Sequence, residues 1–279
     1  MTKDLRKRPI GVFDSGMGGL TVMRALTKRL PHEDFVYLGD TARLPYGTKS
    51  PDTVRRYAVQ CAKALKKHRI KLLVVACNTA SAVALPALRE ALAPMPVIGV
   101  IEPGADAAVE AAPSGRIAVI ATEGTVKGGA YRRAIQTRNA RATVTQLACP
   151  LFVALAEEGL TSGAIAELTA KRYLDPLKEA KPEALVLGCT HFPALKTVIA
   201  NVVGKRVKLV DSADTTAQAV VQLLKRENLA AQKTARGRAR FMVTDSPERF
   251  ARVGEIFLGA KIPSAQVKLI DLGRLQAVG

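Results

Sequence analysis

Two stretches of the sequence, about a hundred residues apart, follow the same pattern. Residues 8–26 (RPIGVFDSGMGGLTVMRAL) and 115–135 (GRIAVIATEGTVKGGAYRRAI) each combine an apolar run typical of a strand, a loop of small polar residues and a basic, helix-like segment. Further along each copy, an apolar run leads directly into a cysteine and polar residues, in LLVVACNTASA at 72–82 and ALVLGCTHFPA at 184–194. An internal repeat of this length predicts two related half-molecules.

Short apolar segments rich in β-branched residues alternate with helix-like segments along the chain. This alternation is typical of parallel sheets covered by helices, and predicts an α/β protein with two pseudo-symmetric domains. Strands are predicted at 9–14, 34–38, 71–76, 96–101, 116–121, 142–148, 184–188, 207–211, 240–244 and 267–271. Among the helices, we predict 50–69, 161–180 and 246–259, with Ser50 and Ser246 as capping residues before a proline.

The repeat also predicts the domain boundaries. We place the first domain at 1–100 plus 210–279 and the second at 101–209, because some 70 residues after 210 would make too small a core alone. Ligands of open parallel sheets bind beyond the carboxyl ends of the strands. The residues at those ends are Asp14, Ser15, Cys77, Asn78, Thr122 and Cys189. We therefore expect an active site where these two sheet edges face each other.

The cysteines and the start of the chain indicate where the protein works. Cys61, Cys77, Cys149 and Cys189 are widely separated, and the start MTKDLRKRPIGVFDSG lacks the apolar region and cleavage site of a secretory signal. No stretch has the roughly 18 uncharged apolar residues that a membrane span needs. We expect a cytoplasmic protein with reduced thiols and no disulfide bonds.

The net charge is strongly positive, with 42 Lys and Arg residues against 24 Asp and Glu residues, or +18. The basic residues are spread along the chain, and their densest stretches contain no interleaved aromatic residues of the kind that stack on bases. We interpret the charge as a solvated surface. A nucleic-acid or topoisomerase (gyrase) contact is the alternative that it leaves open.

Cys77 and Cys189 are the central pair of the predicted site. Either one alone can be a small buried apolar residue, but each begins a polar cluster at the same point of the repeat, where the following helix N-terminus favours a thiolate. Two thiols on facing halves suit proton transfer at opposite faces of one carbon. One sulfur removes a proton while the other delivers one, which inverts the configuration. A cysteine hydrolase using Cys189 and His191 is disfavoured, because residues two apart at a helix start do not point at each other.

Three further features surround this pair. Asp14 and His191 are candidates for groups that orient or tune the nearby thiol. The GMGG stretch at 16–19 matches no phosphate-binding motif, and its backbone suits close approach to a small carboxylate. The loop GDTARLPYGTKS at 39–50 is a candidate substrate-covering loop that offers Tyr46 and nearby amides. No metal is expected, since only three histidines exist and His32 and His68 lie elsewhere.

Five blocks of sequence resemble the glutamate racemases of bacterial cell-wall synthesis. They are IGVFDSGMGGLTV, YLGDTARLPYGTKS, VVACNTASA, CPLFVALAEEG and LVLGCTHFPAL, and the similarity runs from about 9 to 215. The resemblance implies a racemase without a cofactor that interconverts L- and D-glutamate and supplies D-glutamate for peptidoglycan. Racemisation of aspartate or a related small acid is the alternative. We also expect a homodimer.

The resemblance further implies roles for individual residues. Cys77 is then the base that acts on D-glutamate, and Cys189 the base that acts on L-glutamate. Asp14 assists Cys77, while His191 and Glu157, which has Glu158 beside it, assist Cys189. The implied substrate contacts are Asp14, Ser15, Tyr46, Gly47, Asn78, Thr79, Thr122, Thr190 and His191. Most of these contacts are neutral, which allows one thiol to stay protonated.

Overall fold

All ten predicted strands are present in the computed structural model, which describes residues 4–273, and all of them pair in parallel. The strands are β1 (Ile10–Asp14), β2 (Phe35–Gly39), β3 (Leu72–Val75), β4 (Val97–Gly99), β5 (Arg116–Ala121), β6 (Thr143–Ala148), β7 (Ala184–Gly188), β8 (Lys208–Asp211), β9 (Ala239–Val243) and β10 (Val267–Leu269). Strands β1 and β7 are buried along their whole length, as expected for parallel strands covered on both faces. The α/β prediction is confirmed.

Helices cover both sheets. They are α1 (Leu20–Arg29), α2 (Pro51–Lys66), α3 (Asn78–Leu92), α4 (Ile101–Ala111), α5 (Glu123–Gly128), α6 (Ala130–Arg138), α7 (Leu151–Glu157), α8 (Ala164–Leu174), α9 (Leu177–Ala180), α10 (Lys196–Val203), α11 (Ser212–Arg226) and α12 (Pro247–Leu258). Short 3-10 helices lie at η1 (Leu5–Lys7), η2 (Thr41–Arg43), η3 (Tyr46–Thr48), η4 (Phe192–Leu195) and η5 (Ser264–Gln266). Within residues 4–273, no helix is long and apolar enough to cross a bilayer.

Two predictions about helix ends need correction. Ser50 caps α2 as predicted, because its side chain accepts a hydrogen bond from the Thr53 amide. Ser246 makes no capping hydrogen bond before α12: its backbone is left-handed, and Asp245 accepts the Ser246 amide instead. The helix predicted at 161–180 is split into α8 and α9. Pro176, at the break, lacks the amide hydrogen that would continue the hydrogen bonds of α8.

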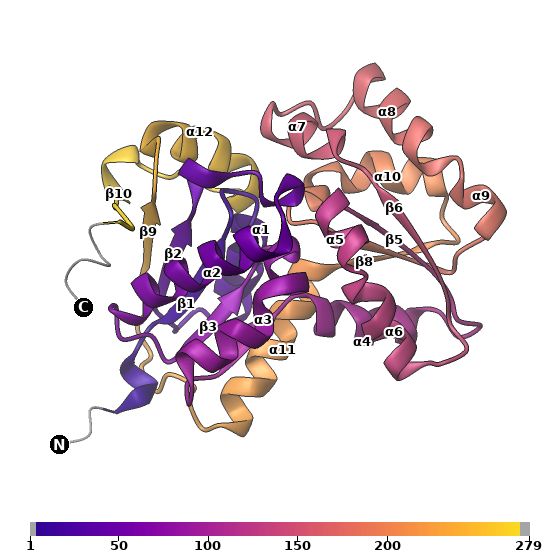
Figure 1. Ribbon diagram of the computed structural model, residues 1–279. Coiled ribbons are helices and arrows are strands. Elements are labelled where there is room, and N and C mark those ends of the chain that lie inside the picture. The colour runs from indigo at the N-terminus through magenta and orange to yellow at the C-terminus, as the bar shows by residue number, and fades with distance from the viewer. Residues whose placement is uncertain (1–3, 274–279) are drawn as a thin grey trace.

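The two sheets have related strand orders, as the sequence repeat predicts. The first sheet runs β10-β9-β2-β1-β3-β4, and the second runs β6-β5-β7-β8. Strands β1 to β4 therefore occupy the same relative positions as β5 to β8. Strands β9 and β10 extend the first sheet beyond β2, so the end of the chain returns to the first lobe, and α4 and α11 lie between the lobes (Figure 1). This arrangement supports the division that we propose, 1–100 plus 210–279 and 101–209.

Buried side chains from both lobes form one continuous apolar cluster. It joins Ile10 of β1 and Leu26 of α1 to Leu187 of β7 and Val220 of α11. A smaller cluster packs against the first sheet, and another packs against the second. The shared cluster holds the lobes together, and the segments after β1, β3, β5 and β7 meet in one region between them, where Thr79 contacts Thr122 and Thr21 contacts Thr190.

Candidate active site

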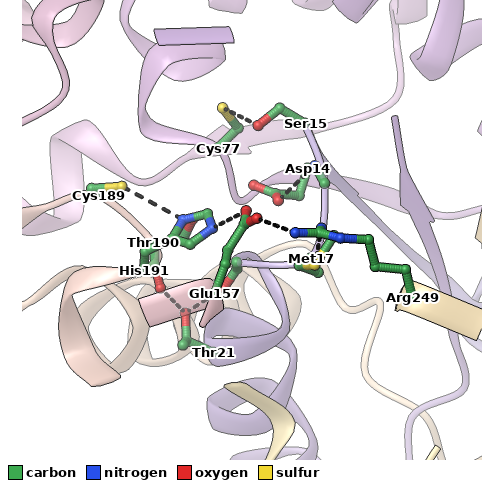
Figure 2. A network of polar contacts seen from close by, with 12 residues as sticks. Asp14, Ser15, Met17, Thr21, Cys77, Glu157, Cys189, Thr190, His191 and Arg249 are labelled. Atoms are coloured by element: carbon green, nitrogen blue, oxygen red, sulfur yellow. Dashed lines mark hydrogen bonds and ion pairs between the residues drawn. The ribbon is translucent and has the colours of Figure 1, made fainter. Parts of the chain in front are cut away.

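The two predicted cysteines reach this region from opposite lobes (Figure 2). Cys77 directly precedes α3, where its Sγ accepts a hydrogen bond from the Ala80 amide at 3.5 Å and lies 3.5 Å from the Ser15 hydroxyl. Cys189 follows β7, and its Sγ lies 3.8 Å from Nδ1 of His191. Each cysteine is only 5% exposed. Both thiols are therefore held by neighbouring polar groups in a site that largely excludes water.

Asp14 lies fully buried at the end of β1, below Cys77 and Ser15 in Figure 2. Its Oδ2 accepts a hydrogen bond from the Gly16 amide at 3.0 Å, but its Oδ1 has no partner among the described residues. Asn78 is similar: its Oδ1 accepts a hydrogen bond from Tyr131, while its buried Nδ2 has no partner among them. Unpartnered buried polar atoms are rare in proteins. One acceptor and one donor are thus available to a ligand on the Cys77 side.

The pKa of Cys77 departs from the sequence-based expectation. Burial raises it to about 12, and the charge of Asp14 adds to the rise, while the hydrogen bonds from Ser15 and Ala80 act against it. The Ala80 amide at the helix N-terminus favours a thiolate as predicted, but the loss of solvation is larger and decides the net shift. A negative charge on Cys189 raises the pKa of Cys77 further. The two sulfurs thus interact, and Cys77 is a thiol at neutral pH.

His191 links Cys189 to Glu157 of α7. Its Nε2 lies 3.1 Å from Oε1 of Glu157, and its Nδ1 faces the sulfur of Cys189. Burial disfavours a charged imidazole, but the hydrogen bonds and charges of Cys189 and Glu157 outweigh it and raise the pKa of His191 to about 10. His191 is therefore an imidazolium at neutral pH. The carboxylate that contacts His191 is that of Glu157, not that of its neighbour Glu158.

The contact between Cys189 and His191 overturns one argument from the sequence. The helix spacing rule predicts that residues two apart at a helix start do not point at each other. The first regular turn, η4, begins only at Phe192, so the spacing rule for helices does not apply to Cys189. A thiol and an imidazole do lie side by side here. The hydrolase alternative still leaves Cys77 without a role.

Hydroxyl groups from both lobes meet beside the cysteines. The Thr79 hydroxyl lies 3.0 Å from that of Thr122 and 3.2 Å from that of Thr125. Thr125 is not among the site residues predicted from the sequence. The Thr190 hydroxyl lies 3.4 Å from Nδ1 of His191. All of these groups are neutral and can both donate and accept hydrogen bonds.

The hydroxyl of Tyr46, a predicted substrate contact, is engaged within its own lobe. The hydroxyl donates to Asp40, and the buried ring packs against Phe13 and Tyr57. Its neighbour Gly47 lies against the second lobe, since a Cβ there would be 2.8 Å from Cβ of Thr122. The loop at 39–50 therefore reaches the predicted region, but through its backbone.

Arg249 is the charged group of this region that the sequence analysis missed. It lies in α12, far along the chain, and its guanidinium contacts Glu157 at 3.1 Å. The segment SPERF contains no motif that separates Arg249 from other basic residues. Only the return of the C-terminal strands to the first sheet brings it here. Within residues 4–273, no group of three or more His, Cys, Asp or Glu residues is placed to hold a metal ion.

The GMGG loop is packed against the Cys189 turn. A Cβ on Gly18 would lie 2.4 Å from Cε1 and Nδ1 of His191 and 2.5 Å from the Thr190 hydroxyl. The Thr21 hydroxyl, at the start of α1, donates to the Thr190 carbonyl at 3.0 Å. The glycine is thus required by close approach of the two lobes, and the loop has a structural role that the sequence did not indicate.

We expect Gly18→Ala to lower kcat/KM by about 10- to 100-fold, because the added methyl group must displace His191 and Thr190 from their positions beside Cys189. Gly128→Ala is the matched control, since its Cβ would make only ordinary contacts at 3.6 Å and 3.8 Å. Steady-state kinetics of both variants would check this. Equal activity of the two variants would contradict the assigned role of the Gly18 approach.

Comparison with known proteins identifies relatives over nearly the whole chain. The family model of Asp/Glu/hydantoin racemase matches residues 10–220. A glutamate racemase from Geobacter metallireducens is 53% identical over 255 residues, which are 91% of this chain and 94% of the relative. The crystal structure of a Francisella tularensis glutamate racemase in complex with D-glutamate superposes with a TM-score of 0.90 at 40% identity, covering 96% of this chain and 99% of the other. A Picrophilus torridus aspartate racemase, at 16% identity, a TM-score of 0.58 and coverage of 78% of this chain and 94% of that one, shows the same fold alone.

Proposed function

The chain belongs to the Asp/Glu/hydantoin racemase family, and from this we infer that it is a glutamate racemase. It interconverts L- and D-glutamate without a cofactor and supplies D-glutamate for peptidoglycan. The observation that carries the inference is the pair of buried thiols that reach one site from opposite lobes. The high identity to curated glutamate racemases favours glutamate over aspartate as the substrate.

We propose that the two sulfurs exchange protons with the α-carbon on its two faces. With L-glutamate, a Cys189 thiolate paired with the His191 imidazolium removes the α-proton, so that an S–H bond forms as the C–H bond breaks. The thiol of Cys77 then delivers its own proton to the opposite face and becomes the thiolate. With D-glutamate the same steps run in reverse. The high pKa of Cys77 supports its role as the donor in the first direction.

We propose that mostly neutral groups, together with the carboxylate of Asp14, hold the substrate. The unpartnered Oδ1 of Asp14 suits the ammonium group, and the unpartnered Nδ2 of Asn78 suits a carboxylate. Hydroxyl groups and the amides at the start of α3 provide further donors. The hydroxyls that we assign to this role belong to Ser15, Thr79, Thr122 and Thr190, while Tyr46 and Gly47 contribute backbone atoms. No lysine or arginine is needed near the thiols. Such a cation would lower the pKa of both thiols and favour two thiolates.

Deuterium incorporation tests this function. When L-glutamate is racemised in deuterated water, we expect the first D-glutamate formed to carry one deuterium at Cα, because Cys77 donates a solvent-derived proton. Unreacted L-glutamate should stay largely unlabelled during these early turnovers. Chiral chromatography with mass spectrometry measures both pools. Product that retains the original proton would exclude two separate bases, and absence of racemisation would exclude the function. Aspartate in the same assay tests the alternative substrate.

Three finer statements belong with this proposal. We keep the cytoplasm as the proposed location. All four cysteines lie in the described part of the chain and are free thiols in the structure. A homodimer is proposed on the resemblance to the family, and light scattering would check it. The +18 charge leaves a nucleic-acid partner as the alternative role of the surface. Binding measured across a salt series would test it, since such binding weakens steeply with salt.

A further inference from the structure

The contacts of Arg249 extend the chain of charged groups that begins at Cys189. Nη2 of Arg249 lies 3.1 Å from Oε2 of Glu157, and Nη1 lies 3.9 Å from the sulfur of Met17 in the GMGG loop. Figure 2 shows the guanidinium on the side of Glu157 away from His191. The order of contacts is thus Arg249, Glu157, His191, Cys189. In the function proposed above only Cys189 touches the reacting carbon, so Arg249 can act only through the others.

Glu157 is held from two sides by this arrangement. His191 contacts Oε1 and Arg249 contacts Oε2, so each carboxylate oxygen has its own charged partner. Burial raises the pKa of Glu157, but the contacts with His191 and Arg249 outweigh it and leave the pKa below its usual value. Because both oxygens are engaged, the carboxylate cannot rotate without breaking one of these bonds.

The same helix holds His191 at a second point. The ring of Phe257, two helical turns after Arg249 in α12, packs edge-on against the His191 ring with centroids 5.0 Å apart. Arg249 and Phe257 both come from the first lobe, whereas Glu157 and His191 come from the second. Helix α12 therefore connects the C-terminal segment of the first lobe to the groups behind Cys189.

We propose that Arg249 is a positioning residue for the acid-base group at Cys189. It holds Glu157 in the orientation and the ionised form that keep the His191 imidazolium beside the sulfur. This inference rests on the proposed racemase function and deepens it, because it assigns a role to the C-terminal helix in the reaction. The charged and titratable groups that face His191 are Cys189 from its own turn, Asp14 from β1 and Glu157 from α7, with Arg249 behind Glu157.

The test compares Arg249→Met with Arg249→Lys and with Arg252→Met. Arg252 is exposed on the same helix, so its replacement removes an equal charge without touching Glu157. We expect Arg249→Met to lower kcat/KM about tenfold, as loss of one charge-assisted hydrogen bond implies. The acid limb of the pH profile of kcat/KM should also move to higher pH in this variant. Without Arg249, Glu157 is protonated more easily, and a protonated Glu157 no longer supports the His191 imidazolium. Arg249→Lys should restore both in part.

The pH profile separates this role from a merely structural one. Loss of stability alone would lower the melting temperature, and it would lower the activity equally at every pH without moving the acid limb. An Arg249→Met enzyme with the pH profile and kcat/KM of the Arg252→Met control would overturn the proposal. If the unmodified protein and the control also fail to racemise glutamate, the proposed function itself is wrong, so the two failures are distinguishable.

Discussion

Serine at position 77 or 189 is expected to lower kcat/KM for racemisation by about 10³-fold or more, because a hydroxyl group is a far weaker acid than a thiol and cannot supply the anionic base at neutral pH. The loss should be the same in both directions for each variant. Two enantiomers have equal free energy, so kcat/KM for L- and D-glutamate must stay equal whatever the enzyme does. Chiral assays started from each pure enantiomer measure this directly.

The other two cysteines provide controls for that experiment. Cys61 and Cys149 are as buried as the catalytic pair, but neither lies at the end of β3 or β7. We expect Cys61→Ala and Cys149→Ala to lower the melting temperature through the small cavity that each creates, and to leave turnover within about twofold. A Cys77→Ser or Cys189→Ser enzyme with near-normal rates would contradict the two-base scheme.

Replacement of Asp14 with asparagine is expected to lower kcat/KM about 10²-fold, because it removes the buried carboxylate that tunes Cys77 and offers Oδ1 to the substrate. The change keeps the shape of the side chain, so the fold should be retained. His191→Asn is the mirror variant, since it removes the imidazolium beside Cys189.

Isotope effects distinguish the two variants, although their rates fall alike in both directions. Asp14→Asn slows the step at Cys77, so we expect the isotope effect on kcat/KM with Cα-deuterated substrate to rise more for D-glutamate, whose proton Cys77 removes. His191→Asn slows the step at Cys189 and should give the larger rise for L-glutamate. The same preferred enantiomer in both variants would mean that the two residues do not serve different sulfurs.

The sequence indicated most of the fold because the relevant signals are local. Apolar runs of β-branched residues identify strands such as β3 and β7, and the repeat identifies their equivalence. The positions of Cys77 and Cys189 follow from the same reasoning, since polar residues after parallel strands meet at one edge. The ends of helices depend on more than local composition. Ser246 and Pro247 repeat the residues Ser50 and Pro51, but Ser246 has a left-handed backbone and its amide donates to Asp245, so it makes no capping hydrogen bond.

The remaining features depend on contacts between distant segments. The hydroxyl of Tyr46 is engaged by Asp40, which no motif reveals. The raised pKa of Cys77 depends on how completely the two lobes bury it, and a sequence shows only the helix that follows. Arg249 reaches Glu157 only because β9 and β10 carry α12 back to the first lobe. Each of these requires the tertiary arrangement before its chemistry can be stated.

A crystal structure with glutamate bound tests the central claim most directly. We expect the Sγ atoms of Cys77 and Cys189 to lie on opposite faces of the α-carbon, each within about 3.5 Å of that carbon. A glutamate whose α-carbon has both sulfurs on one face, or only one sulfur within reach, would contradict the account.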